Sequence, residues 1–133
     1  MSDLEEHGVD MAAELSSYQR RVEQWLEACF PPHVRSDRGE RTHRFLEEAL
    51  ELAQANGATR DDVLALVDYV FGRPTGEPSQ EVGGVMVTLA SLCSASEINM
   101  EDAGDRELER NWERIDLIRL KQQSKPHGSP LPQ

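Results

Sequence analysis

The chain has 133 residues, with 25 acidic and 14 basic side chains and a formal net charge of −11. This length allows one domain with one core and is too short for two domains of ordinary size. The negative charge disfavours binding to nucleic acid and to anionic membrane surfaces, although a divalent cation can still mediate contact with a phosphate group.

Features that would place the chain outside the cytoplasm are missing from the sequence. No apolar stretch approaches the roughly 20 residues of a membrane span. The first ten residues are acidic and polar, unlike a signal peptide. Cys29 and Cys93 stand in apolar contexts without a Cys or His at zinc-ligand spacing, so we expect two reduced thiols. The sequence therefore predicts a cytoplasmic protein that does not bind membranes.

Helical periodicity accounts for nearly all of the chain. Apolar residues recur at helical spacing in five segments, which are 10–29, 38–56, 60–71, 80–96 and 100–123. No segment shows sustained β alternation. The sequence predicts an all-α fold, a small bundle of about five helices, that occupies residues 10–123. Residues 1–9 are expected to form a flexible N-terminus and residues 124–133, with three prolines, a disordered tail.

Local signals mark where the second and third helices begin and end. Asp37 and Glu40 have the spacing of a capping box at the start of the second helix. Gly57 is a natural left-handed stop after it. Thr59 is a natural N-cap for the third helix, because two aspartates follow in the first turn.

The last two helices differ in their pattern of charge. Residues 82–93 contain no charged side chain, and a helix that is apolar all round is typical of a buried central helix. In the last helix, apolar residues recur at helical spacing and charged side chains occupy most of the other positions. Its predicted buried positions are Leu108, Trp112, Ile115, Leu117 and Ile118.

Three glutamates on the second helix form the main candidate site. Glu47, Glu48 and Glu51 fall within an arc of about 100°. Like charges at this spacing repel one another, and a bound divalent cation removes the repulsion. Hard oxygen ligands suit Mg²⁺ or Mn²⁺. Glu81 opens the fourth helix and could face this cluster across two antiparallel helices. A solvated helix face is the plain alternative, because such acidic runs are common in helical proteins.

This pattern resembles that of a known enzyme family. The run Glu47-Glu48-Ala49-Leu50-Glu51, followed by Glu81 at the start of an apolar helix, is similar to the signature of the MazG-like all-α nucleoside triphosphate pyrophosphohydrolases. The resemblance covers roughly residues 38–119. It implies magnesium-dependent hydrolysis of a nucleoside triphosphate to the monophosphate and pyrophosphate. It also implies a homo-oligomer, either a dimer or a tetramer.

The resemblance assigns a role to each of these acids. Glu48, Glu51 and Glu81 would be metal ligands, and Glu47 or Glu51 would accept the proton of the attacking water. In the last helix, Asn111 and Arg114 resemble the polar pair of the family. With Lys121, they would contact the substrate phosphates.

One position departs from the family pattern. The last aspartate of the signature falls on Gly84 in this chain. Two alternatives to an active enzyme therefore stay open. One is a MazG-like protein that has lost catalysis and binds a nucleotide or a protein partner as a regulator. The other is an acidic helical interaction module whose glutamates are solvated.

Overall fold

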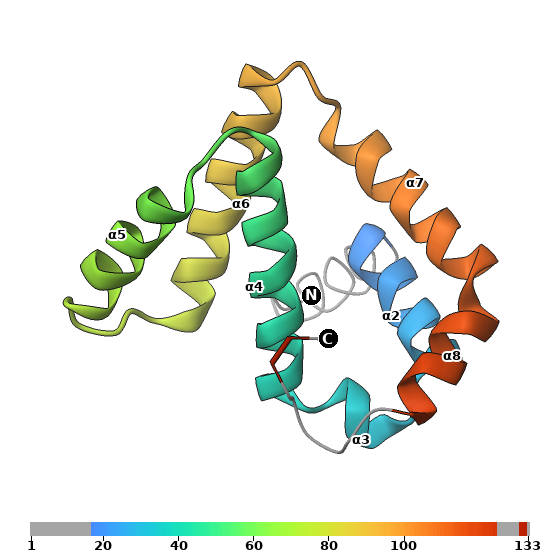
Figure 1. Cartoon of the computed structure of the whole chain (residues 1–133). Helices are drawn as coiled ribbons and strands as arrows, with labels where there is room; N and C mark the ends of the chain where they lie inside the picture. The colour runs from blue at the N-terminus through green and yellow to red at the C-terminus, as the bar shows by residue number, and fades with distance from the viewer. Residues whose placement is uncertain (1–16, 125–130, 133) are drawn as a thin grey trace, which may run out of the picture. The chain divides into compact units, whose positions relative to one another are not determined.

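The computed structural model describes residues 17–124 and 131–132. Within these ranges the chain is all-α and has no strand (Figure 1), which confirms the all-α part of the predicted fold. The described helices, in chain order, are α2 (Tyr18–Cys29), α3 (Pro32–Arg35), α4 (Arg38–Ala55), α5 (Arg60–Phe71), α6 (Pro78–Ala95), α7 (Met100–Glu113) and α8 (Ile115–Gln123).

The helices lie close to the predicted segments, with two differences. The last predicted helix is divided at Arg114 into α7 and α8. The short helix α3 was not predicted, and it begins directly after Pro31, because proline suits the first turn of a helix. Residues 1–16 and 125–130 lie outside the described part of the chain, and with them the predicted N-terminus and most of the predicted tail.

The turn between α4 and α5 follows the local signals in the sequence. Gly57 has a φ of 90°, and the N–H of Ala58 donates to the carbonyl of Ala53 at 3.0 Å. This bond, with a second from Gly57 to Gln54, is a Schellman motif that closes α4. Thr59 then caps α5 by exchanging hydrogen bonds with Asp62.

Two glycines provide a matched test of this turn. Gly57→Ala should lower the free energy of unfolding by about 1 to 2 kcal/mol, because an L side chain is strained at positive φ. Gly83→Ala should raise it by about 0.5 to 1 kcal/mol, since Gly83 lies within α6 and an added Cβ meets nothing within 4 Å. Urea unfolding at one protein concentration measures both changes. Equal effects of the two substitutions would contradict the left-handed turn.

The helices fall into two compact units. The first contains α2, α3, α7, α8 and the first turn of α4, and the second contains α5, α6 and the rest of α4. In the first unit, α2 contacts α3 and α8. The Tyr18 hydroxyl donates to the carbonyl of Gly104 at 3.0 Å, and Arg119 donates to the carbonyl of Ala28. These bonds hold α7 and α8 against α2.

The first unit also holds the buried apolar residues of the described chain, which are Cys29, Val34 and Leu108. Burial raises the pKa of the Cys29 thiol, which favours its protonated form. The other positions predicted to be buried in the last helix are more open. Ile115 and Ile118 are half-buried, whereas Trp112 and Leu117 are exposed, so the prediction is wrong for this last pair.

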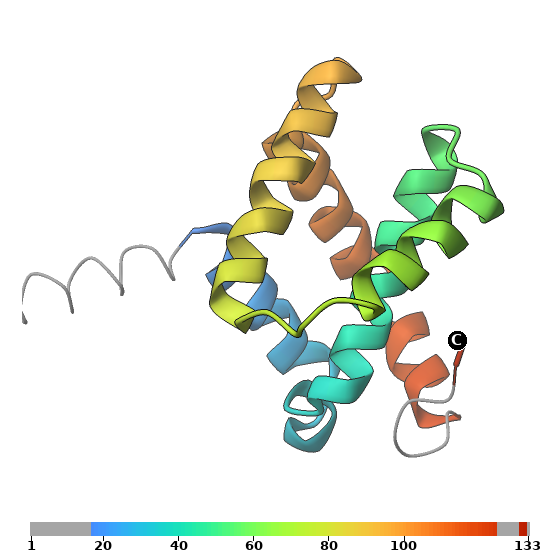
Figure 2. The same cartoon turned by 90° about the vertical axis from the view of Figure 1, so that its left-hand side faces the viewer.

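The second unit buries none of its residues, which overturns the prediction of a buried central helix at 80–96. Figure 2 shows α5 and α6 joined by the 72–77 loop. Ten large hydrophobic residues of these two helices are exposed. They are Leu64, Leu66, Val67, Tyr69, Val70, Phe71, Val82, Val85, Met86 and Val87.

The composition of the helices also bears on membrane insertion. Over the described ranges, no helix taken singly has both the length and the apolar character needed to cross a membrane.

Candidate functional site

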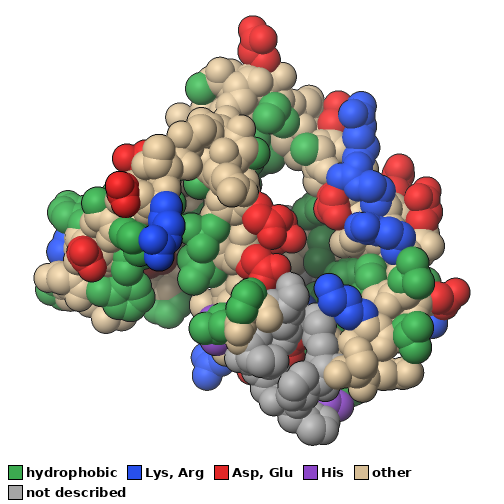
Figure 3. Space-filling view, viewed as in Figure 1, with side chains coloured by type: hydrophobic (Ala, Val, Ile, Leu, Met, Phe, Trp, Pro, Cys, Tyr) green, Lys and Arg blue, Asp and Glu red, His purple; other side chains and the backbone are tan. Residues whose placement is uncertain are grey.

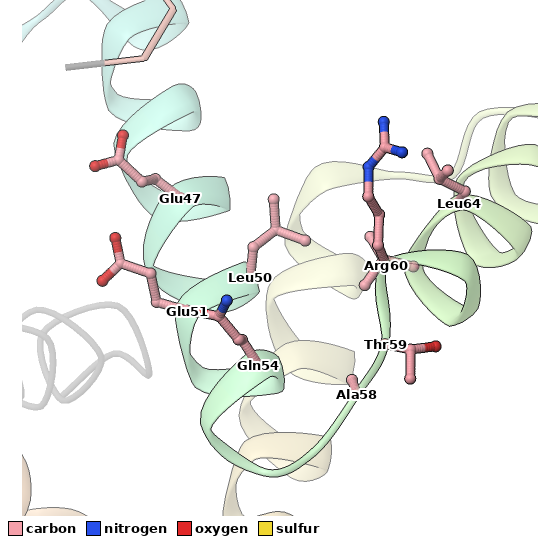
Figure 4. Close-up of a pocket in the computed structure, with 9 residues that line it drawn as sticks. Glu47, Leu50, Glu51, Gln54, Ala58, Thr59, Arg60 and Leu64 are labelled. Atoms are coloured by element: carbon pink, nitrogen blue, oxygen red, sulfur yellow. The ribbon is translucent and has the colours of Figure 1, made fainter.

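The predicted acidic cluster lies on α4 in the second unit. In Figure 4 the carboxylates of Glu47 and Glu51 leave α4 on the same side, one turn apart. Glu48 is exposed and belongs to the same arc of the helix. In the space-filling view, acidic side chains gather along α4 (Figure 3). The structure therefore places these three glutamates as their spacing predicted.

Arg44 is a member of this cluster that the sequence analysis missed. Its Nη1 donates to Oε2 of Glu47 at 3.1 Å, and both side chains are partly buried. Its Nε and Nη2 are buried and have no hydrogen-bond partner among the residues that the structure describes. Buried guanidinium nitrogens are normally bonded, and Trp25 and Arg41 also have a buried nitrogen without a partner among the described residues. The spacing of Arg44 three residues before Glu47 could have indicated the pair.

A hollow of about 460 Å³ lies between α4 and α5, beside the cluster. Leu50 projects from α4 on the side of α5 (Figure 4). The apolar part of the lining comes from Leu50, Val63 and Leu64, and the polar part from Glu47, Glu51, Gln54, Thr59 and Arg60. Its volume is in the range of small-molecule sites, and its mixed lining suits a ligand with an apolar ring and polar substituents.

Glu81 does not join the acids of α4. Glu77 caps α6 by accepting from the N–H groups of Gln80 and Ser79, and these bonds lower the pKa of its carboxyl group. The side chain of Glu81 lies against Gly76, so that a Cβ added to Gly76 would collide with the Glu81 carboxylate. No group of three or more His, Cys, Asp or Glu side chains that could hold a metal ion occurs in the part of the chain that the structure describes.

Gly84 lies one turn after Glu81 on α6. An added Cβ at Gly84 meets nothing within 4 Å. The Gly84 carbonyl accepts a hydrogen bond from the Thr88 hydroxyl at 2.9 Å. The glycine therefore does not mark a close helix contact in this structure.

The predicted phosphate contacts lie in the first unit, on α7 and α8. Nη2 of Arg114 donates to Oδ1 of Asn111 at 3.3 Å, so the structure brings this pair together. Arg114 also lies 3.7 Å from Glu107, which partly neutralises its charge. Lys121 is exposed near the end of α8. The acids of α4 belong to the other unit, and the role of these three residues stays a prediction.

The α4 acids fit a magnesium ion in the type of donor they offer. Mg²⁺ prefers oxygen ligands, and it is commonly bound by one or two carboxylates while water and substrate phosphates complete the coordination. Glu51 with Glu47 or Glu48 meets this requirement without a third acid from another helix. Glu81 remains a predicted ligand that this structure does not bring to the cluster.

Comparisons with protein-family models, with curated proteins and with solved structures found no match to this chain. The resemblance to the MazG-like family therefore depends on the residues quoted above and on the order of the helices.

Proposed function

We propose that this protein hydrolyses a nucleoside triphosphate to the monophosphate and pyrophosphate in a magnesium-dependent reaction, as a MazG-like helical enzyme. The observation that carries the proposal is the face of α4, where Glu47 and Glu51 line a hollow of about 460 Å³ and Arg44 forms an ion pair with Glu47. Carboxylates and a guanidinium group on one helix face suit a substrate that carries both a metal ion and phosphates.

The glutamates of α4 would have two different roles, metal binding and proton transfer. Glu48 and Glu51 would hold the magnesium ion, with Glu81 as the further ligand that the resemblance implies. When bound, the ion neutralises charge that develops on the phosphates and lowers the pKa of water. Glu47, fixed by Arg44 at 3.1 Å, would orient the attacking water and accept its proton. The nucleoside would enter the hollow against Leu50 and its apolar neighbours.

Polar and positively charged side chains would bind the phosphates. Arg44 would turn its buried Nε and Nη2 toward the triphosphate, because a guanidinium binds phosphate oxygens in a bidentate manner. Asn111 and Arg114 would add the contacts that the resemblance implies, and Lys121 would add a further positive charge near the phosphates.

The direct experiment is an assay of pyrophosphate release from a panel of ribo- and deoxyribonucleoside triphosphates, with magnesium and with EDTA. We expect release from at least one nucleotide that depends on magnesium or manganese. Failure with every nucleotide in the panel, using protein whose helical content is normal, would refute the proposed activity.

Arg44→Ala should raise the KM for the triphosphate about tenfold, since charged hydrogen bonds to the phosphates are lost. Arg44→Lys should have a smaller effect, because it keeps the charge and loses the bidentate geometry. Arg106→Ala removes an exposed arginine of α7 and serves as the control for net charge. Steady-state kinetics separates KM from kcat. A fall in kcat at constant KM would mean that Arg44 only positions Glu47.

A further inference from the structure

Two polar side chains of the hollow between α4 and α5 form no hydrogen bond or ion pair with another described residue. Gln54 lies in the last turn of α4 and Arg60 opens α5, and Figure 4 shows one on each side of the turn between the helices. The Thr59 hydroxyl, by contrast, accepts the capping hydrogen bond of α5. With Glu47 and Glu51 assigned to the water and the metal ion, Gln54 and Arg60 remain for the rest of the substrate.

The apolar walls of the hollow are suited to the flat faces of a base. Leu50 on α4 is 41% exposed and Leu64 on α5 is 44% exposed, and Val63 beside them is half-buried. A ring seated between these side chains would remove apolar surface from water on both helices. A volume of about 460 Å³ admits a base of two fused rings.

We infer that this hollow selects a nucleotide whose base is a 6-oxopurine, such as guanine or hypoxanthine, and that Arg60 makes the selection. The inference rests on the proposed function, because it takes the triphosphate to lie along α4. A guanidinium group only donates hydrogen bonds, and N7 and O6 of a 6-oxopurine are two acceptors at the spacing of its fork. Adenine presents an amino donor in place of O6, and a pyrimidine has no N7.

Gln54 has a different role, which is to hold any purine by its opposite edge. A primary amide both donates and accepts. It can pair with O6 and the N1–H of guanine, and after rotation by half a turn it can pair with the amino group and N1 of adenine. Gln54 therefore adds affinity without choosing between the two purines, and the choice depends on Arg60.

The first test compares kcat/KM for four triphosphates in the presence of magnesium. GTP and ITP should react alike, because neither Gln54 nor Arg60 is assigned to the 2-amino group of guanine. Both should exceed ATP by about tenfold or more, the discrimination expected of one bidentate pair. In 7-deaza-GTP a carbon atom replaces N7, and it should react several-fold more slowly than GTP. Equal rates for GTP and ATP in the parent protein would overturn the inference.

Three variants assign the preference to its residue. Arg60→Ala should bring GTP, ATP and 7-deaza-GTP to similar rates, because the contact with O6 and N7 is lost. Gln54→Leu should slow GTP and ATP by the same factor and keep their ratio. Arg73→Ala is the matched control for charge, since Arg73 is an exposed arginine of the same unit that does not line the hollow. A penalty for 7-deaza-GTP that persists in Arg60→Ala would overturn the inference.

Binding without metal separates this inference from the proposed activity. In EDTA, GMP should raise the melting temperature more than AMP does, and Arg60→Ala should remove the difference. If no triphosphate is hydrolysed and this difference is observed, the proposed activity fails and the inference stands. If triphosphates are hydrolysed without a preference for 6-oxopurines, the inference fails and the proposed activity stands. Equal shifts with GMP and AMP, or no shift with either, would also overturn the inference.

Discussion

Glu48→Gln and Glu51→Gln should each reduce magnesium-dependent pyrophosphate release about 100-fold or more, while the helical content stays normal. Each change replaces a carboxylate by a neutral amide of nearly the same size, so a metal ligand is lost and packing is kept. A metal ion contributes several kcal/mol to the stabilisation of phosphoryl charge, and 1.36 kcal/mol corresponds to a factor of ten in rate. The loss should therefore appear in kcat and in the magnesium concentration required for half-maximal rate.

The matched control is Glu109→Gln, which makes the same change of charge at an exposed position of α7. It should keep the activity of the parent. The apo forms of the Glu48 and Glu51 variants should be as stable as the parent or slightly more stable, because removal of one charge relieves repulsion along α4. Parental turnover and magnesium affinity in both variants would show that the cluster does not bind the catalytic metal.

The same measurements separate the proposed enzyme from the two alternatives. A regulatory nucleotide-binding protein should show a rise in melting temperature with nucleotide and magnesium but no turnover, and Glu51→Gln should remove that rise. An interaction module should show neither response. The open position at Gly84 keeps the first alternative relevant, because an aspartate ligand of the family pattern is replaced there by a residue without a side chain.

Features of the fold that depend on near neighbours in sequence were predicted well. Gly57 ends α4 in the left-handed conformation, and Thr59 caps α5 through Asp62, because each signal acts over three or four residues. The α4 acids were predicted for the same reason, since 100° per residue fixes which side chains share a face. Arg44 could have been included on that basis, as its bond to Glu47 spans one helical turn.

Burial was predicted poorly, because it depends on which helix faces meet. The uncharged pattern of α6 is consistent with a helix covered by its own chain and with a helix covered by a second copy, and periodicity cannot distinguish the two. The position of Glu81 is a similar case. Its predicted approach to α4 required two helices to pack along each other, whereas its carboxylate lies beside Gly76 in the adjoining loop.

Leu108→Ala should lower the free energy of unfolding by about 2 to 5 kcal/mol, the range for a buried leucine whose removal leaves a cavity. Leu108 is 6% exposed on α7, whereas Leu117 on α8 is 67% exposed, although helical periodicity predicted both to be buried. Leu117→Ala should therefore change stability by no more than about 0.5 kcal/mol. Urea unfolding followed by circular dichroism measures both at one protein concentration, which keeps any contribution of self-association constant. Since few apolar side chains of the described chain are buried, the first unit should be sensitive to the loss of one of them. Equal costs for the two leucines would mean that α7 does not bury Leu108 in solution.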